Sequence, residues 1–90
     1  IKLFMDINEL IAIVKKKLER DIVLEKINIE DKSFLHKGHK GNNENKFHLK
    51  ISLNSSELSK LSKIESNRKI YKILNKEIKN YIHSLQILIS

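Results

Sequence analysis

The sequence contains no cysteine. The fold therefore has no disulfide support, and secretion is not indicated, because small secreted domains commonly depend on disulfides. The chain also lacks a thiolate that could act as a nucleophile or as a metal ligand. Any metal that it binds must be held by nitrogen or oxygen atoms.

Arginine is scarce as well. The formal net charge is +7, but only Arg20 and Arg68 are arginines, and lysine supplies the rest of the positive charge. This balance permits a nucleic acid, an anionic membrane or an acidic protein as a partner. Sequence-specific reading of DNA relies on the two-pronged contact of arginine with guanine, whereas lysine favours weak attraction to phosphates. The abundant Lys, Asn and Ile are equally consistent with the base composition of the source genome.

Long apolar runs are absent too. None approaches the ~20 residues that a membrane span needs, so no membrane association is expected. Ninety residues predict a single domain over 1–90. Residues 1–5 are too short for a signal peptide, and we expect them to be disordered or to be an artificial edge of the sequence.

The first half predicts a helix followed by two strands. Apolar residues recur at helical spacing from Ile7 to Leu18, after a capping-box pair at Asp6 and Glu9. β-branched residues and alternation favour a strand over 22–30. Both glycines fall in 31–45, which we expect to be a long, flexible loop. Clean alternation over 47–53 then predicts a half-buried strand, antiparallel to the first.

The second half predicts a short helix, a longer helix and a last strand. Asn54 with Glu57 and Ser62 with Glu65 have capping-box spacing. The apolar stripe of the longer helix is formed by Ile70, Ile73, Leu74, Ile78 and Tyr81. Ile82–Ile89 reads as the closing strand. The order αββααβ predicts an α+β fold in two layers, with the helices on one face of the sheet.

No set of catalytic residues assembles, so we do not expect an enzyme. Gly38-His39-Lys40-Gly41 matches the G-x-x-G loop with which KH domains clamp single-stranded nucleic acid. That loop joins two helices in KH domains, whereas here it joins two predicted strands. We interpret the match as chance.

The four histidines are the informative polar residues. Strand geometry predicts that His83 shares a face with Leu85, at the mouth of the core. From this alone, His83 reads more readily as a hydrogen-bonded strand-end residue than as a ligand. His36 and His39 read as solvated loop residues, and the strand register points His48 outward, away from the core.

Four blocks together resemble the BolA-like family. Residues 31–39 are similar to the pattern D-x-S-x-x-H-x-G-H, and 47–51 resemble the strand that follows it. Residues 68–74 are similar to R-x-I-Y-x-x-L, and 82–87 resemble I-H-A-L-x-I. The blocks keep their order and spacing, and with the elements around them the resemblance spans about 6–89.

The resemblance implies a fold like class II KH domains, with a three-stranded mixed sheet. It also implies a monothiol glutaredoxin partner and a 2Fe-2S cluster that exists only in the complex. The glutaredoxin cysteine, a glutathione thiol and BolA side chains would share this cluster. His83 matches the C-terminal histidine ligand, and the loop would supply the second ligand, His36 or His39. A cluster with two imidazoles on one iron and two thiolates on the other has Rieske-type ligation, which raises its reduction potential. Imidazole ligation is lost on protonation, so such a cluster is suited to transfer or sensing.

The runner-up function is a DNA-binding transcriptional regulator that uses the KH-like helix-turn-helix region. Its candidate contacts are Lys60, Lys63, Arg68 and Lys69. The pair Ser66-Asn67, where the family often has Arg-His, and Lys60, where it often has glycine, weaken this reading. We expect an intracellular protein, cytoplasmic or mitochondrial, which is a monomer alone or a weak homodimer.

Overall fold

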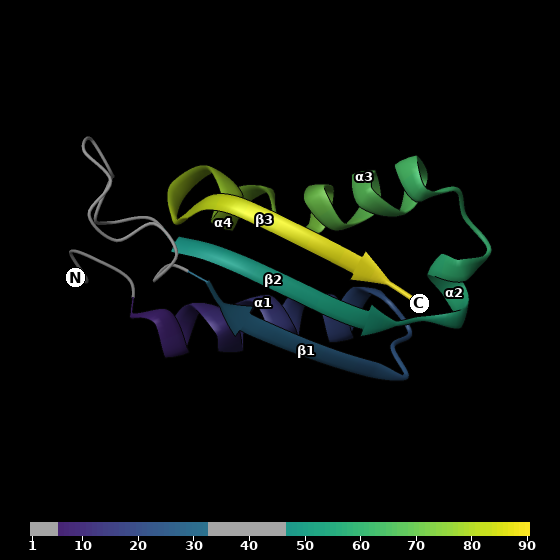
Figure 1. Cartoon of the computed structure of the whole chain (residues 1–90), viewed down its shortest axis with the longest axis horizontal. Helices are drawn as coiled ribbons and strands as arrows, with labels where there is room; N and C mark the ends of the chain where they lie inside the picture. Colours follow the sequence, from purple (N-terminus) through teal and green to yellow (C-terminus); the bar gives the residue numbers. More distant parts are fainter. Residues whose placement is uncertain (1–5, 33–46) are drawn as a thin grey trace.

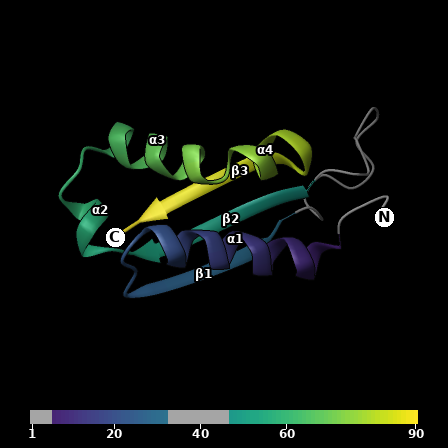
Figure 2. The same cartoon turned by 180° about the vertical axis from the view of Figure 1, so that it is seen from behind.

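The computed structural model describes residues 6–32 and 47–90 as a two-layer α+β domain. Figure 1 shows the sheet in front of the helices, and Figure 2 shows the helices covering that one face. The predicted αββααβ order and helix placement are therefore confirmed, with the last helical region in two pieces. The elements are α1 (Ile7–Asp21), β1 (Lys26–Asp31), β2 (Phe47–Asn54), α2 (Ser56–Ser59), α3 (Lys63–Ile73), α4 (Asn75–Asn80) and β3 (Ile82–Ile89).

The sheet is mixed, as the family resemblance implies. Its strand order is β1-β2-β3, with β2 antiparallel to β1 and parallel to β3. The clean alternation of β2 follows from its central place, because Leu49, Ile51 and Leu53 are buried toward the helices. The bounds of β3 are those that the sequence predicts.

The core lies between the sheet and the helices. Its members share helical spacing on α1 and α3 and alternate spacing on the strands. The fully buried apolar residues are Leu10, Val14, Leu18, Ile22, Leu49, Ile51, Leu53, Leu58, Ile70, Leu74 and Ile82. Burial of this apolar surface is the main force that holds the layers together.

Of the three predicted capping boxes, the one at Ser62 and Glu65 is confirmed as an N-cap, and its carboxylate bonds to the Ser62 hydroxyl. The Ser62 hydroxyl accepts the Glu65 N–H at 3.1 Å and donates to the Glu65 carboxylate at 3.0 Å. Asp6 is the N-cap residue of α1, but its side chain makes no capping hydrogen bond. The cap of α2 is Ser55 and not Asn54, because Asn54 still belongs to β2.

Two element boundaries also differ from the predicted ones. The first strand begins at Lys26 rather than at residue 22, because Ile22 caps α1 and is buried in the core. The long helix is interrupted at Leu74, which separates α3 from α4. The predicted apolar stripe nevertheless packs on the core along both pieces.

Ser55 ties the start of α2 to the connection between α1 and β1. Its hydroxyl accepts the Leu58 N–H at 3.1 Å and donates to the Val23 carbonyl at 2.8 Å, and the residue is 2% exposed. Ser55→Ala removes both bonds in a buried place. We expect it to lower the free energy of unfolding by ~1–2 kcal/mol. Urea titration measures this, with the exposed Ser56→Ala as a matched control; equal midpoints would contradict the role of the cap.

Glu57 makes the stability of the contact between α2 and the α1–β1 connection dependent on pH. The Lys69 ammonium and, next, the Val23 N–H donate to its carboxylate and hold the pKa of Glu57 below its usual range. A lowered folded-state pKa stabilises the fold above the unfolded-state pKa, and this contribution is lost as the pH falls through the folded-state value.

We therefore expect Glu57→Gln to destabilise the protein at pH ~7 and the difference from wild type to shrink at pH ~3. Urea unfolding at both pH values measures it. Glu19→Gln is the control, because Glu19 is exposed and forms no ion pair with a residue in the described ranges. A constant difference between wild type and Glu57→Gln at the two pH values would contradict the assignment.

Candidate metal centre

Two histidines meet at one end of the sheet, where β2 and β3 begin. The ring centroids of His48 and His83 are 5.0 Å apart, with the ring planes at 62°. β2 and β3 run parallel (Figure 1), and each histidine is the second residue of its strand. Sequence periodicity predicts that these two residues lie on different faces of the sheet, and it does not predict their contact.

The prediction that His83 faces the core with Leu85 is wrong. The register shifts between Phe47 and His48, so that Phe47 lies opposite Ile82 but His48 lies opposite Ser84. His83 is the extra residue of this bulge. Ile82 is buried instead, and His83 is exposed.

The prediction that His48 points away from the core is right about the face but not about its accessibility. Its neighbours along β2, Phe47 and Leu49, pack toward the helices, so alternation places His48 on the other face. His48 is nevertheless only 5% exposed. A central strand has neighbours on both sides, and here the ring of His83 lies against that of His48.

The other two histidine candidates, His36 and His39, lie outside the described residues. The strand ends that flank this segment are described, and both are fixed beside the histidine pair. The Lys32 N–H donates to the His48 carbonyl at 2.7 Å, and the Phe47 N–H donates to the Tyr81 carbonyl at 2.8 Å. Lys32 and Phe47, the described residues on either side of this segment, therefore both lie next to the histidine pair.

The donor set at this end is suited to a metal held by nitrogen. His83 presents an imidazole on an exposed bulge, and no thiolate competes with it. Within 6–32 and 47–90, no group of three or more histidine or carboxylate side chains lies close enough to enclose an ion. Ligands from elsewhere, in the chain or in a partner, are thus needed to complete a four-coordinate site.

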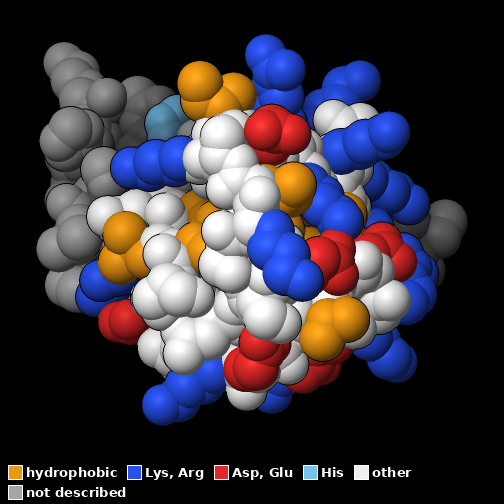
Figure 3. All heavy atoms as spheres, turned by 90° about the vertical axis from the view of Figure 1, so that its right-hand side faces the viewer, with side chains coloured by type: hydrophobic (Ala, Val, Ile, Leu, Met, Phe, Trp, Pro, Cys, Tyr) orange, Lys and Arg blue, Asp and Glu red, His pale blue; other side chains and the backbone are white. Residues whose placement is uncertain are grey.

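The predicted nucleic-acid contacts lie at the opposite end of the domain, around α2 and the start of α3. Lys60, Lys63 and Arg68 are exposed. Lys69 is half-buried and forms an ion pair with Glu57. Figure 3 looks at this end and shows lysine and arginine side chains mixed with acidic and apolar ones. The positive charge there does not form one continuous patch.

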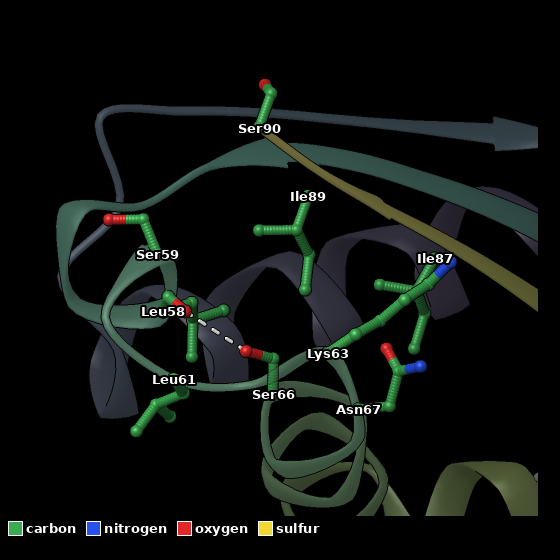
Figure 4. Close-up of a pocket in the computed structure, with 9 residues that line it drawn as sticks. All are labelled: Leu58, Ser59, Leu61, Lys63, Ser66, Asn67, Ile87, Ile89 and Ser90. Atoms are coloured by element: carbon green, nitrogen blue, oxygen red, sulfur yellow. Dashed lines mark hydrogen bonds between the residues drawn. The ribbon is translucent and has the colours of Figure 1, made fainter.

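A hollow of about 320 Å³ lies at the same end, between β3 and the start of α3. Figure 4 shows Ile87, Ile89 and Leu58 around it, together with the Ser66 hydroxyl, which donates to the Leu58 carbonyl at 3.1 Å. Among the described residues that line it there is no histidine or carboxylate. The hollow therefore offers no acid–base pair for catalysis.

Ser66 has a structural role. It is 2% exposed, so the serine that stands where the family often has arginine holds α3 against α2.

No helix within the described ranges is long and apolar enough to cross a bilayer.

Comparison with known proteins adds a family. The family model described as BolA-like protein matches residues 18–90. The chain is 27% identical over 75 residues to a Haemophilus influenzae protein named DNA-binding transcriptional regulator BolA, which covers 83% of this chain and 70% of the relative.

Solved structures give the same fold. The BolA domain of SufE1 from Arabidopsis thaliana superposes with a TM-score of 0.73 at 28% identity, over 88% of this chain and 87% of that one. BolA1 from Arabidopsis thaliana superposes with a TM-score of 0.75 at 24% identity, over the same shares of the two chains. The latter similarity concerns the fold alone.

Proposed function

The chain belongs to the BolA-like protein family, and on this basis we propose that it is a non-enzymatic adaptor for iron–sulfur clusters. It binds a monothiol glutaredoxin and shares a 2Fe-2S cluster with it, for cluster trafficking or iron sensing. The observation that carries the proposal is the exposed imidazole of His83 on the bulge at the start of β3. The matching histidine is the C-terminal ligand that the family resemblance implies.

Each side contributes different donors to this complex. The glutaredoxin cysteine and a glutathione thiol bind one iron, and imidazoles of this chain bind the other. His83 is the ligand on a fixed strand, and we propose His36 or His39 as the ligand from the segment that follows β1. Mixed nitrogen and thiolate ligation raises the reduction potential of a cluster relative to ligation by four cysteines.

This chain positions its own ligand through the sheet. The parallel pairing of β2 with β3 fixes the backbone on both sides of His83, while the bulge keeps the side chain out of the core. Ile82, buried at 3% exposure, anchors the strand immediately before the ligand. The imidazole is thus presented to a partner without unfolding any core residue.

Visible circular dichroism tests the proposal. We expect a cluster-loaded monothiol glutaredoxin to change its visible spectrum when this protein is added, with saturation at one equivalent. Apo-glutaredoxin mixed with this protein is the control and gives no visible signal. A spectrum that equals that of the cluster-loaded glutaredoxin alone, at every ratio, would contradict the proposed partnership.

A second candidate function is DNA binding, which the name of the Haemophilus influenzae relative favours. The exposed Lys60, Lys63 and Arg68 are the contacts that it would use. Binding to several duplexes at rising salt concentrations separates specific from nonspecific attraction. Sequence preference that survives physiological salt would favour a regulator. Binding that falls equally for all duplexes would leave only the attraction of lysine to phosphate.

A further inference from the structure

We propose that this chain binds an acidic, extended peptide segment of a partner protein as an added strand on β3. The site is the β3 groove, formed by the free edge of β3 at residues 85–89 and the hollow beside α3. Within the described ranges the strand order is β1-β2-β3, so β3 pairs with β2 alone. An extended peptide forms main-chain hydrogen bonds with such an edge, and pockets for its alternate side chains give specificity.

The two edges of the sheet differ in their protection against such pairing. β1 carries Lys26, Glu30 and Asp31, and charges on an edge strand oppose pairing with another chain. β3 is eight residues long and contains no lysine, arginine, aspartate, glutamate or proline. Leu88, whose neighbours Ile87 and Ile89 pack on the core, is 45% exposed. β3 is therefore the edge that is suited to accept a strand.

The backbone groups that face the free edge belong to Leu85, Ile87 and Ile89. The Ser90 N–H donates to the Leu53 carbonyl of β2 at 2.9 Å. The direction of the backbone hydrogen bonds alternates along a strand, so every second residue before Ser90 also faces β2. The residues between them direct their N–H and C=O groups away from β2, toward an added strand.

The hollow provides a pocket for one side chain of the peptide. In Figure 1, α3 lies behind β3 and extends beyond its free edge. Between them is the hollow of about 320 Å³, whose apolar lining is Leu58, Leu61, Ile87 and Ile89. Side chains alternate between the two faces of a strand, so every second side chain of the peptide points toward the helices. The hollow accepts one branched apolar side chain from this row.

The charge beside the hollow selects an acidic segment. Figure 4 shows the Lys63 side chain extending from α3 toward Ile87. Lys63 is exposed and forms no ion pair with a described residue. A carboxylate two positions from the apolar side chain shares its face and reaches this ammonium. A second copy of this chain fits poorly, because each copy has a net charge of +7 and β3 offers no carboxylate to Lys63.

The β3 groove is separate from the proposed cluster ligand. His83 is the second residue of β3 and Ile89 is the last, which places them roughly 20 Å apart at the rise of a strand. A peptide that ends in the hollow therefore leaves the exposed imidazole accessible. The chain can hold a partner segment and share a cluster at the same time.

A synthetic peptide tests the groove on the whole chain, without glutaredoxin. In the peptide Thr-Glu-Thr-Leu-Thr-Glu-Thr, the leucine and both glutamates share one face, so either strand direction places a carboxylate beside the leucine. Fluorescence anisotropy of the labelled peptide is expected to show saturable binding, which Lys63→Glu weakens about tenfold or more. Lys79→Glu is the matched control, because Lys79 is exposed on α4 and does not line the hollow. We expect it to bind within about twofold of wild type, because distant charges are screened.

Amide NMR on the wild-type chain separates strand addition from attraction between charges. Hydrogen exchange at the N–H groups of Leu85, Ile87 and Ile89 is expected to slow when the peptide binds, and a peptide with lysines in place of the glutamates is expected not to bind. The proposal is overturned if the acidic peptide does not bind saturably, if these exchange rates stay unchanged, or if the lysine peptide binds equally well.

Sedimentation velocity of the protein alone tests the alternative occupant. We expect a monomer. A dimer that protects the same three amides would overturn the proposal, because a second copy of the chain would then occupy the β3 groove. Since no glutaredoxin is present in any of these measurements, their failure leaves the proposed cluster sharing untouched.

Discussion

His83→Ala is expected to remove most of the visible circular dichroism signal that this protein generates with a cluster-loaded monothiol glutaredoxin. His83 is the exposed imidazole on the β3 bulge, and the chain has no thiolate to take its place. Loss of groups that only orient a metal ligand costs about 10–100-fold in affinity, so loss of the ligand itself costs at least as much. Titration of the complex by visible circular dichroism measures the change.

The design of this experiment depends on the exposure of His83. Because the side chain is outside the core, we expect the substitution to change the free energy of unfolding by less than about 0.5 kcal/mol. A weaker signal is then not a consequence of unfolding. Gln86→Ala is the matched control, because Gln86 is exposed on the same strand. An unchanged spectrum and an unchanged cluster lifetime for His83→Ala would mean that His83 is not a ligand.

Lys17→Met is expected to lower the free energy of unfolding by about 2–4 kcal/mol. The Lys17 ammonium lies 2.7 Å from Glu77 Oε2, and the side chains are 28% and 6% exposed. Without Lys17, a nearly buried carboxylate on α4 has lost its counter-ion. Its second oxygen, Oε1, has no hydrogen-bond partner among the described residues. The cost is below that of a fully buried pair, because Lys17 retains contact with water.

Urea unfolding of three variants separates this effect from a change in helix propensity. Lys16→Met is the control, because Lys16 is exposed on the same turn of α1. The double variant Lys17→Met/Glu77→Gln is expected to recover part of the lost stability, because the buried charge has been neutralised. The account of the pair is wrong if Lys17→Met and Lys16→Met unfold at the same urea concentration.

The family could be predicted from four short sequence blocks. The element order and most of the core could be predicted because they depend on the local periodicity of apolar residues. The alternation of β2 and the apolar stripe from Ile70 to Tyr81 each report one buried face. Ser62 with Glu65 is likewise a local pattern, and the structure forms that cap.

The site could be predicted only in part, because its geometry depends on the pairing of distant strands. The bulge that exposes His83 depends on the register of β3 against β2. The alternation of apolar residues within β3 alone does not indicate where that register shifts. His48 was missed as a neighbour of His83 for the same reason. One signal was available: both histidines stand at the start of strands that a βαβ-type connection makes parallel.

The central claim is that histidine nitrogens of this chain bind the shared cluster, and isotope labelling tests it most directly. This protein is prepared with ¹⁵N-histidine, combined with unlabelled, cluster-loaded monothiol glutaredoxin, and the reduced complex is studied by pulsed electron paramagnetic resonance. We predict strong imidazole ¹⁴N couplings in the unlabelled complex, replaced by ¹⁵N couplings in the labelled one and weakened by His83→Ala. Identical spectra from the labelled and unlabelled complexes would contradict the account.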